Sequence, residues 1–246
     1  MCTHAQRRED SNLNRDSVLY KKSWAAGARL KSDGFSLAAE FTKSKRYKRS
    51  ILIQTQFSYF LHPKQTKQPS RYGGSGLFGD GFKPFVYGKQ NTLFTLYLGA
   101  GQKFLVAEKG KRHGVQIFLQ YAGGITLGLL KPYYVKVIPK PLTTADIEDL
   151  VDVTYEEGVD NSFLDYDRIV GGSGFGKGWK LKAQPGLHLE VGMQFDFGKN
   201  DSFLKALEVG IASDFYYKKV PVMVDKNKII YPSVYAGFML GKRKEK

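Results

Sequence analysis

Residues 186–198 read GLHLEVGMQFDFG and place a histidine and two carboxylates in one alternating row. Apolar and polar side chains alternate along this stretch, and a period of two sends the two rows to opposite faces of a β-strand. His188, Glu190 and Asp196 share the polar row with Gln194. Because histidine and carboxylate side chains are the commonest general acids and bases, this row is the first candidate for chemistry.

The spacing of His188 and Glu190 tests an enzymatic interpretation. Some small lipid-modifying membrane enzymes use a strand-borne His-x-Ser pair, in which the histidine activates a serine nucleophile. Here Glu190 occupies the serine position, so the nucleophile would have to come from another strand, such as Ser36 or Ser58. We therefore expect no enzymatic activity and keep modification of lipid A or phospholipid as an alternative.

Two other segments approach known binding motifs without completing them. The run GGSGFGKG at 171–178 resembles a phosphate-binding loop, but Gly178 stands where serine or threonine must bind magnesium. Residues 146–167 are rich in Asp and Glu but lack the EF-hand pattern with its central glycine. We interpret the first as a flexible glycine loop and the second as a solvated external loop, and we expect no cofactor and no metal site.

Composition narrows the class of protein. The 246 residues include 38 Lys and Arg against 23 Asp and Glu, which gives a net charge of +15, and a single cysteine, which excludes an internal disulfide framework. No apolar run approaches the roughly 18 residues of a transmembrane helix. A basic chain suits nucleic acid, anionic lipid or acidic partners. Since no nucleic-acid recognition element is recognisable, we expect no nucleic-acid binding.

Alternation is the organising pattern of the chain from Ser23 onward. About eight segments follow it, at residues 23–31, 35–42, 51–61, 94–103, 115–129, 187–197, 207–215 and 234–240. Closing such apolar strands into a barrel removes the edges that would otherwise aggregate. The polar rows are rich in Gly, Ala, Gln and Ser, which suit a crowded interior, whereas the apolar rows carry bulky side chains that lipid tolerates. The sequence therefore predicts an all-β, closed antiparallel transmembrane β-barrel of about eight strands; a soluble barrel or sandwich is the alternative.

The same parity predicts a filled polar lumen. It places inside the barrel a set of charged side chains: Arg29, Lys31, Glu40, Lys103, His188, Glu190, Asp196, Glu208 and Asp214. Buried charges must pair, and an eight-stranded barrel is just wide enough for its own side chains. We expect Arg29 to contact Glu40 or Asp214, and we expect no ion-conducting pore.

The connections alternate in length, which predicts an orientation. Short basic turns at 43–50, 108–114 and 198–203 share one end with both termini, whereas 61–89 and 136–180 are long. Bacterial outer-membrane barrels have their short turns in the periplasm, so we expect a Gram-negative outer membrane with both termini periplasmic. The short turns and the C-terminus form a basic periplasmic rim of Lys45, Arg46, Lys48, Arg49, Lys109, Lys111, Arg112, Lys242 and Arg243. This rim suits either phospholipid headgroups or a docking partner.

The N-terminus reads as a polar tail over residues 1–22, followed by a single barrel domain over residues 23–246. Residues 3–5, Thr-His-Ala, resemble the end of a signal peptide, which would make residues 1–5 a remnant of one. A plain polar tail is the alternative.

Several pieces of the chain together resemble a family of small outer-membrane β-barrels of Bacteroidota envelopes. These pieces are WAAGARL, FSLAAEF, HPKQTKQ, KPFVYGKQN, LGLLKPYY, PGLHLEVGMQFDFG, EVGIASDFYYKKVPVM and GFMLGKR. The resemblance spans residues 24–243, although basic residues follow Leu240 in place of a terminal aromatic. It implies an accessory subunit of a larger machine, of the type IX secretion or barrel-assembly kind.

We therefore expect a non-enzymatic integral outer-membrane protein that acts as a structural or scaffolding subunit of an envelope complex. The expected partners are outer-membrane lipids, including lipopolysaccharide, and other envelope proteins. A small passive pore is the further alternative.

Overall fold

The computed structural model describes residues 20–46, 48–69, 83–108, 114–138, 150–156, 162–174, 176–198, 202–225 and 227–245. The tail over residues 1–19 lies outside this set. None of the described residues forms a helix that is long and apolar enough to cross a membrane.

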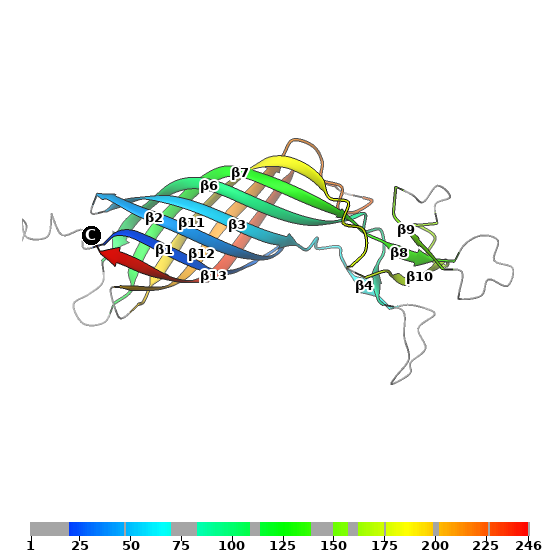
Figure 1. Ribbon diagram of the computed structural model, residues 1–246, viewed down its shortest axis with the longest axis horizontal. Coiled ribbons are helices and arrows are strands. Elements are labelled where there is room, and N and C mark those ends of the chain that lie inside the picture. Colours follow the sequence, from blue (N-terminus) through cyan, green and yellow to red (C-terminus); the bar gives the residue numbers. More distant parts are fainter. Residues whose placement is uncertain are drawn as a thin grey trace, which may run out of the picture.

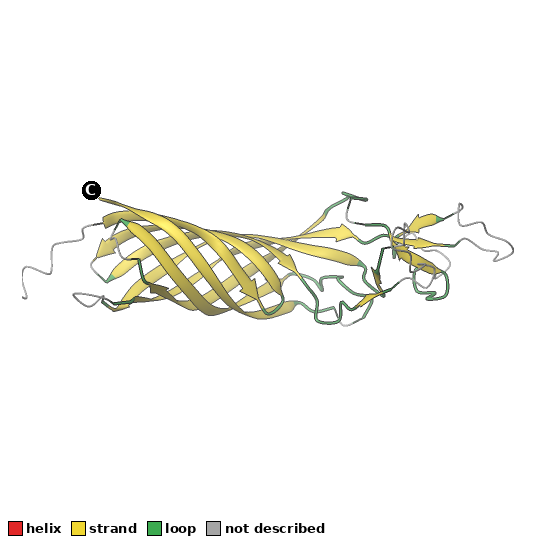
Figure 2. Ribbon diagram, turned by 90° about the horizontal axis from the view of Figure 1, so that it is seen from below, coloured by secondary structure: helices red, strands yellow, loops and turns green. Residues whose placement is uncertain are grey.

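Eight long strands form one closed barrel (Figures 1 and 2). They are β1 (Tyr20–Lys31), β2 (Gly34–Arg46), β3 (Arg49–Phe60), β6 (Asn91–Ala107), β7 (Gln116–Pro132), β11 (Lys182–Asp196), β12 (Phe203–Tyr216) and β13 (Ile230–Glu245). Their order is β1-β13-β12-β11-β7-β6-β3-β2, every neighbouring pair is antiparallel, and β13 closes onto β1. This confirms the closed antiparallel barrel that the alternation predicts.

The strands run beyond the segments expected from side-chain alternation. β1 starts at Tyr20 rather than at Ser23. β2 extends as far as Arg46, and β3 already begins at Arg49. β13 extends as far as Glu245. Backbone pairing explains the difference, because Lys22 is paired with Lys43 on one side and with Lys244 on the other. Ladder hydrogen bonds join backbone groups, so pairing continues where the apolar row has ended.

Five short strands lie beyond one end of the barrel, where Figure 1 shows them at the end opposite the C-terminus. They form a two-stranded sheet of β4 (Lys67–Gln68) and β5 (Phe85–Val86) and a three-stranded sheet of β8 (Val135–Val137), β9 (Val151–Val153) and β10 (Ile169–Gly172). A buried cluster holds them together and comprises Phe85, Val135, Val137, Val153, Phe163 and Ile169. We call this assembly the loop subdomain.

The loop subdomain corrects two expectations from the sequence. The acidic stretch is not simply a solvated loop, because Val151–Val153 pairs with β8 and Val153 and Phe163 are buried. Part of the glycine run is not flexible either, because Gly171 and Gly172 pair with Lys136 and Val135. Contacts between residues far apart in the chain order both segments, and local composition carries no sign of them.

The outward face of the barrel is apolar on every strand. Large side chains are exposed along it, including Leu30 at 74% and Ile125 at 65%. Polar residues of the same strands point inward, as in β3, where Gln54, Gln56 and Ser58 are buried. A soluble barrel would show the opposite arrangement, since soluble monomers rarely expose a continuous apolar surface of this extent.

Candidate functional site

Arg29 on β1 lies at the centre of the lumen and is fully buried. Its Nη1 lies 3.0 Å from Glu190 Oε2 on β11, and its Nη2 lies 2.8 Å from Glu208 Oε2 on β12. Its Nη1 also donates to Gln56 Oε1 at 3.1 Å, and its guanidinium lies 4.7 Å from the centre of the Tyr235 ring. One planar guanidinium thus joins strands from opposite parts of the barrel wall.

The expected partners of Arg29 were wrong, because neither Glu40 nor Asp214 forms its ion pairs. Lys103 instead engages Glu40, with its Nζ 2.8 Å from Oε1 and 3.0 Å from Oε2. His188 engages Asp214, with Nδ1 2.7 Å from Oδ1. Parity fixes which side chains enter the lumen, whereas partner choice depends on their height along the barrel axis.

The ion pairs join into one continuous chain. On the side toward the long loops, Glu190, which pairs with Arg29, has its Oε2 3.5 Å from His188 Nε2. Asp214, which pairs with His188, lies 3.8 Å from Lys31 Nζ. Lys31 Nζ in turn lies 3.7 Å from Asp33. We call this chain the lumen ion chain; it comprises Asp33, Lys31, Asp214, His188, Glu190, Arg29, Glu208, Gln194, Lys103 and Glu40.

The other half of the lumen ion chain runs through an amide. Gln194 Nε2 donates to Glu208 Oε1 at 2.9 Å, and its Oε1 accepts from Lys103 Nζ at 2.7 Å. A buried amide can donate through its nitrogen and accept through its oxygen, so it can stand between two charged groups in a hydrogen-bond network. Glu208 and Glu40 are therefore linked through one glutamine and one lysine.

The formal charges of the lumen ion chain do not cancel. Five carboxylates, Asp33, Glu40, Glu190, Glu208 and Asp214, face three fixed cations, Arg29, Lys31 and Lys103, and one imidazole. The chain is therefore negative by two charges with a neutral His188 and by one with a protonated His188. The contacts of this formally acidic interior join β1, β2, β6, β11 and β12.

One sequence-predicted lumen residue is buried as expected but forms a separate ion pair, and one residue that sequence reasoning missed joins the lumen ion chain. Asp196 forms an ion pair with Arg243 of β13, apart from the lumen ion chain. Asp33 joins the chain although it lies in the turn between β1 and β2. Strand parity could not include Asp33, because that rule applies only within strands. The one indication in the sequence was that Asp33 follows Lys31 by two residues.

Two clusters of apolar side chains are buried inside the barrel and at its loop end. At the end with the short turns, Ala25, Ala38, Leu204, Ala206 and Met239 form a buried cluster. At the other end a larger cluster lies under the loops and comprises Phe60, Val86, Leu93, Leu130, Tyr216, Val220, Val222, Met223 and Tyr231. We call this second cluster the loop cap.

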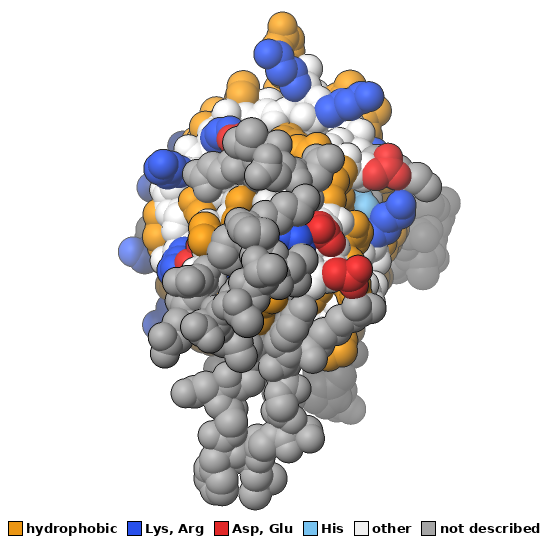
Figure 3. Space-filling view, turned by 90° about the vertical axis from the view of Figure 1, so that its right-hand side faces the viewer, with side chains coloured by type: hydrophobic (Ala, Val, Ile, Leu, Met, Phe, Trp, Pro, Cys, Tyr) orange, Lys and Arg blue, Asp and Glu red, His pale blue; other side chains and the backbone are white. Residues whose placement is uncertain are grey.

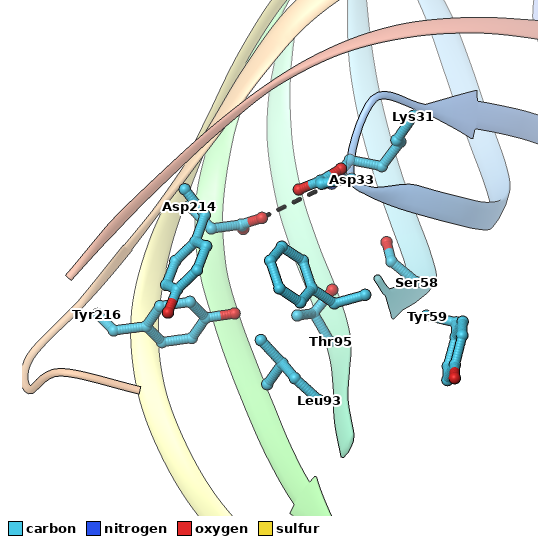
Figure 4. A pocket seen from close by; sticks show the side chains of 10 residues that line it. Lys31, Asp33, Ser58, Tyr59, Leu93, Thr95, Asp214 and Tyr216 are labelled. Atoms are coloured by element: carbon cyan, nitrogen blue, oxygen red, sulfur yellow. Dashed lines mark ion pairs between the residues drawn. The ribbon is translucent and has the colours of Figure 1, made fainter. Parts of the chain in front are cut away.

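A small cavity separates the lumen ion chain from the loop cap (Figure 4). Its volume is about 10 Å³, and Lys31, Asp33, Ser58, Thr95 and Asp214 are among its lining residues. Roughly 10–15 Å³ is the space that one water needs. The cavity is therefore too small for a solute.

The surroundings of His188 bear on the enzymatic alternative. Both ring nitrogens face carboxylates, those of Asp214 and Glu190, and the ring lies 4.2 Å from the ring of Tyr97. Ser58 accepts a hydrogen bond from Gln56 at 2.7 Å and forms no contact with His188. Within the described ranges no group of His, Cys, Asp and Glu is arranged to hold a metal ion.

The basic periplasmic rim is described only in part. Lys109, Lys111 and Arg112 lie outside the described residues, and Arg46 ends β2. Lys45, Lys48 and Lys242 are exposed. Arg49 is exposed and donates to Gln102 Oε1 at 2.8 Å, while Arg243 pairs with Asp196. The exposed members give this end of the barrel a cationic surface.

Two ionisable groups in the loops have shifted pKa values. Burial lowers the pKa of Lys89, with help from the charge of Lys67, to about 8. Burial by itself would raise the pKa of Asp152, but hydrogen bonds from Lys177 and Ser173 outweigh it and lower that pKa. These groups belong to the loops and lie outside the barrel strands.

Comparison with known proteins gives structural likenesses alone. No protein-family model matches the chain, and no curated protein sequence shows significant similarity to it. Ail, the attachment invasion locus protein of Yersinia pestis, in complex with the heparin analogue sucrose octasulfate, is similar with a TM-score of 0.43 and 8% identity, over 91% of this chain and 97% of that one. Neisserial surface protein A is similar with a TM-score of 0.42 and 9% identity, over 92% of this chain and 95% of that one.

The N-terminal β-barrel domain of Pseudomonas aeruginosa OprF is also similar, with a TM-score of 0.37 and 6% identity, over 92% of this chain and 98% of that one.

Proposed function

We propose that this chain is an integral outer-membrane β-barrel with a sealed lumen, and that it serves as a structural subunit of an envelope complex. One observation carries the proposal: bulky apolar side chains face outward on all eight barrel strands, while the charged row faces inward and is paired. The outer face suits lipid, and the inner face suits a rigid, closed body.

Backbone geometry supports a membrane location. A closed barrel satisfies the backbone hydrogen bonds of all its strands, which lipid requires. The barrel strands are 12 to 17 residues long, and about 9 to 11 suffice to cross a bilayer. In bacterial barrels the short turns face the periplasm, so we place the turn between β2 and β3 there together with the C-terminus.

The interior supports a structural role over a passive pore. Ion flow would have to break charge-assisted contacts in the lumen ion chain and then pass the apolar loop cap. Each broken buried pair costs about 3–5 kcal/mol when one charge is left without a partner. The enzymatic alternative gains no support from His188, since its ring nitrogens face Asp214 and Glu190 in a closed lumen.

The short-turn end supports a partner. Lys45, Lys48, Arg49 and Lys242 are exposed there and form a cationic surface. Such a surface attracts an acidic protein face, and it also attracts phospholipid headgroups. We propose that another envelope protein uses it, with outer-membrane lipid around the barrel.

Affinity purification tests this role. The tagged chain is extracted in mild detergent and the copurifying proteins are quantified, next to a variant with Lys45, Lys48, Arg49 and Lys242 changed to Gln. A control variant removes Lys64, Lys67, Lys83 and Lys228, which are exposed in the long loops. We expect a stoichiometric partner with the native chain and the control, and its loss with the first variant. Absence of a stable partner, or equal loss in both variants, would count against the proposal.

A further inference from the structure

Exposed aromatic and cationic side chains gather at the loop end of the barrel, where β7 ends and β11 begins, next to the end of β12. Trp179 is 62% exposed and Tyr217 is 82% exposed. Exposed lysines flank them at 180, 182, 218 and 219. We call this set the lysine–aromatic rim; it comprises Trp179, Lys180, Lys182, Tyr217, Lys218 and Lys219.

Strand pairing brings the members of the lysine–aromatic rim together. The backbone N–H of Tyr217 donates to the Pro185 carbonyl at 3.4 Å, so the end of β12 runs beside the start of β11. Lys182 of β11 is paired with Leu130 of β7. Lys131, which follows Leu130 in β7, has its Nζ 4.4 Å from the centre of the Trp179 ring. Figure 3 shows lysine and arginine side chains along the margin of this end of the molecule.

One acid contacts the rim within the described part of the loops. Lys182 Nζ forms an ion pair with Glu156 at 2.5 Å. Lys218 Nζ lies 5.7 Å from the Tyr217 ring, which leaves its charge at the surface. The lysine–aromatic rim therefore keeps a net positive charge, with two amphipathic rings of the kind found at membrane interfaces.

An apolar groove on the outer face of the barrel comes within two residues of the rim, between Phe215 and Tyr217. It has a volume of about 430 Å³ and lies across β11, β12 and β13, with Leu189, Val191, Ile211, Phe215 and Val234 in its lining. Phe215 lies in the outward row of β12, and Tyr217 follows two residues later, directly after the end of that strand. The groove and the rim thus form one continuous surface.

We propose that this surface binds one molecule of lipid A, the phosphorylated and acylated glycolipid anchor of lipopolysaccharide. An acyl chain occupies the groove, and the phosphates contact Lys180, Lys218 and Lys219. The inference rests on the proposed function, because the long loops must face outward for the rim to lie in the outer leaflet. Lipid A fits better than a phospholipid because cations from two separate segments, 180–182 and 218–219, match a headgroup with two phosphates.

Binding of defined lipids to the purified chain tests the proposal. The native chain in detergent is titrated with bisphosphorylated lipid A, monophosphorylated lipid A and phosphatidylglycerol, and complexes are counted by native mass spectrometry. We expect the order bisphosphorylated, then monophosphorylated, then phosphatidylglycerol. Equal binding of lipid A and phosphatidylglycerol would overturn the assignment.

Two variants and a matched control locate the site. Changing Lys180, Lys218 and Lys219 to Gln should weaken lipid A binding more than about tenfold, since lysines near an anionic headgroup act additively. The variant V234W fills the groove and should weaken binding without a change of charge. Changing Lys64, Lys67 and Lys83 to Gln removes the same charge from other loops and should leave binding unchanged. Equal losses in the two lysine variants would overturn the proposal.

Flotation with phospholipid vesicles tests the proposed membrane location separately from the proposed lipid A site. All variants should float with the vesicles, because none of the substitutions changes the alternation of outward apolar and inward polar side chains in the barrel strands. A native chain that does not float removes the membrane proposal itself. A chain that floats but binds lipid A no better than phosphatidylglycerol removes the lipid site alone.

Discussion

Arg29 shows how a single side chain can determine the interior of a barrel. It contacts Glu190, Glu208 and Gln56 and packs against the Tyr235 ring, so residues of four other strands meet at one guanidinium. Lysine could not replace it, because a single ammonium lacks the planar fork that serves two carboxylates at once.

Removal of Arg29 should destabilise the barrel strongly. Arg29→Met leaves Glu190 and Glu208 buried without their cation, and we expect a loss of about 3–5 kcal/mol in the free energy of unfolding. Urea denaturation in lipid vesicles measures it. The exposed control Arg49→Met should cost at most about 1 kcal/mol.

A compensated variant checks that the cause is charge. The triple change R29M/E190Q/E208Q removes both carboxylates together with the cation, so it should recover most of the lost stability. If R29M matches the native chain, or the triple variant is as unstable as R29M, the account of the lumen ion chain is wrong.

Lys89 gives a pH dependence in the loop region. Its folded-state pKa of about 8 lies below the ordinary lysine value of 10.5, so the folded state disfavours the charged form. Below pH 8 the cost of burying the charge is fully present, and it disappears as the pH rises from about 8 to 10.5. Stability should therefore increase over this window, by on the order of 2–3 kcal/mol.

The variant Lys89→Met should remove this increase and stabilise the protein at pH 7. Thermal unfolding between pH 7 and 10 measures the effect, with the exposed Lys83→Met as the control that keeps the native slope. A native slope that persists in Lys89→Met would show that another group titrates.

At the scale of elements, Gly237 on β13 illustrates how a strand makes room for the side chain of its neighbour. A Cβ at this position would lie 2.5 Å from Arg29 Cγ and 2.9 Å from the Ala28 carbonyl oxygen. Gly237 and Arg29 are directly paired between β13 and β1, the two strands that close the barrel. The glycine thus belongs to the closure of the barrel.

Gly237→Ala should therefore weaken the closing pair of strands, at a cost of about 1–3 kcal/mol. The change in urea midpoint measures it. Gly176→Ala is the matched control, because a Cβ there has no neighbour within 4 Å. Equal stability of the two variants would contradict the close approach of Arg29.

The loop subdomain should behave as a separate element with its own core. Phe163 is 2% exposed and packs with Val153 and Ile169. Phe163→Ala should cost about 3–5 kcal/mol locally and open the loop subdomain to proteases, while the barrel resists them. Limited proteolysis measures both parts in one experiment. Val151→Ala, at a side chain that is 50% exposed, should leave the pattern unchanged; cleavage of the barrel itself in Phe163→Ala would contradict two independent units.

At the scale of the whole molecule, the filled lumen decides how the barrel behaves toward ions. The lumen ion chain fills the barrel below the loop cap, and the apolar cluster around Met239 packs inside the barrel toward the short-turn end. A filled lumen of this kind predicts that no aqueous path joins the two ends of the barrel.

Planar bilayers should therefore remain silent after insertion of the native chain. An open porin, reconstituted in the same way, serves as the positive control, and vesicle flotation shows that the chain has inserted. Regular conductance steps from the native chain would show that the lumen opens, and the passive-pore alternative would then replace the structural one.

The alternation of side chains in the sequence determined the two faces of this protein. Leu30 and Leu187 point outward and Arg29 and His188 inward because a strand turns each successive side chain to the opposite face, whatever its partners are. The fold class and most of the lumen residues followed from this local rule, which is why they were predictable.

Tertiary structure decided the partners. Arg29 meets Glu190 and Glu208 rather than Glu40, because strand register and tilt set the height of each side chain along the barrel axis. The packing of Val153 with Ile169 and the approach of Trp179 to Lys131 likewise join segments that are distant in the chain. Such contacts depend on long-range pairing, for which a single sequence contains no local signal.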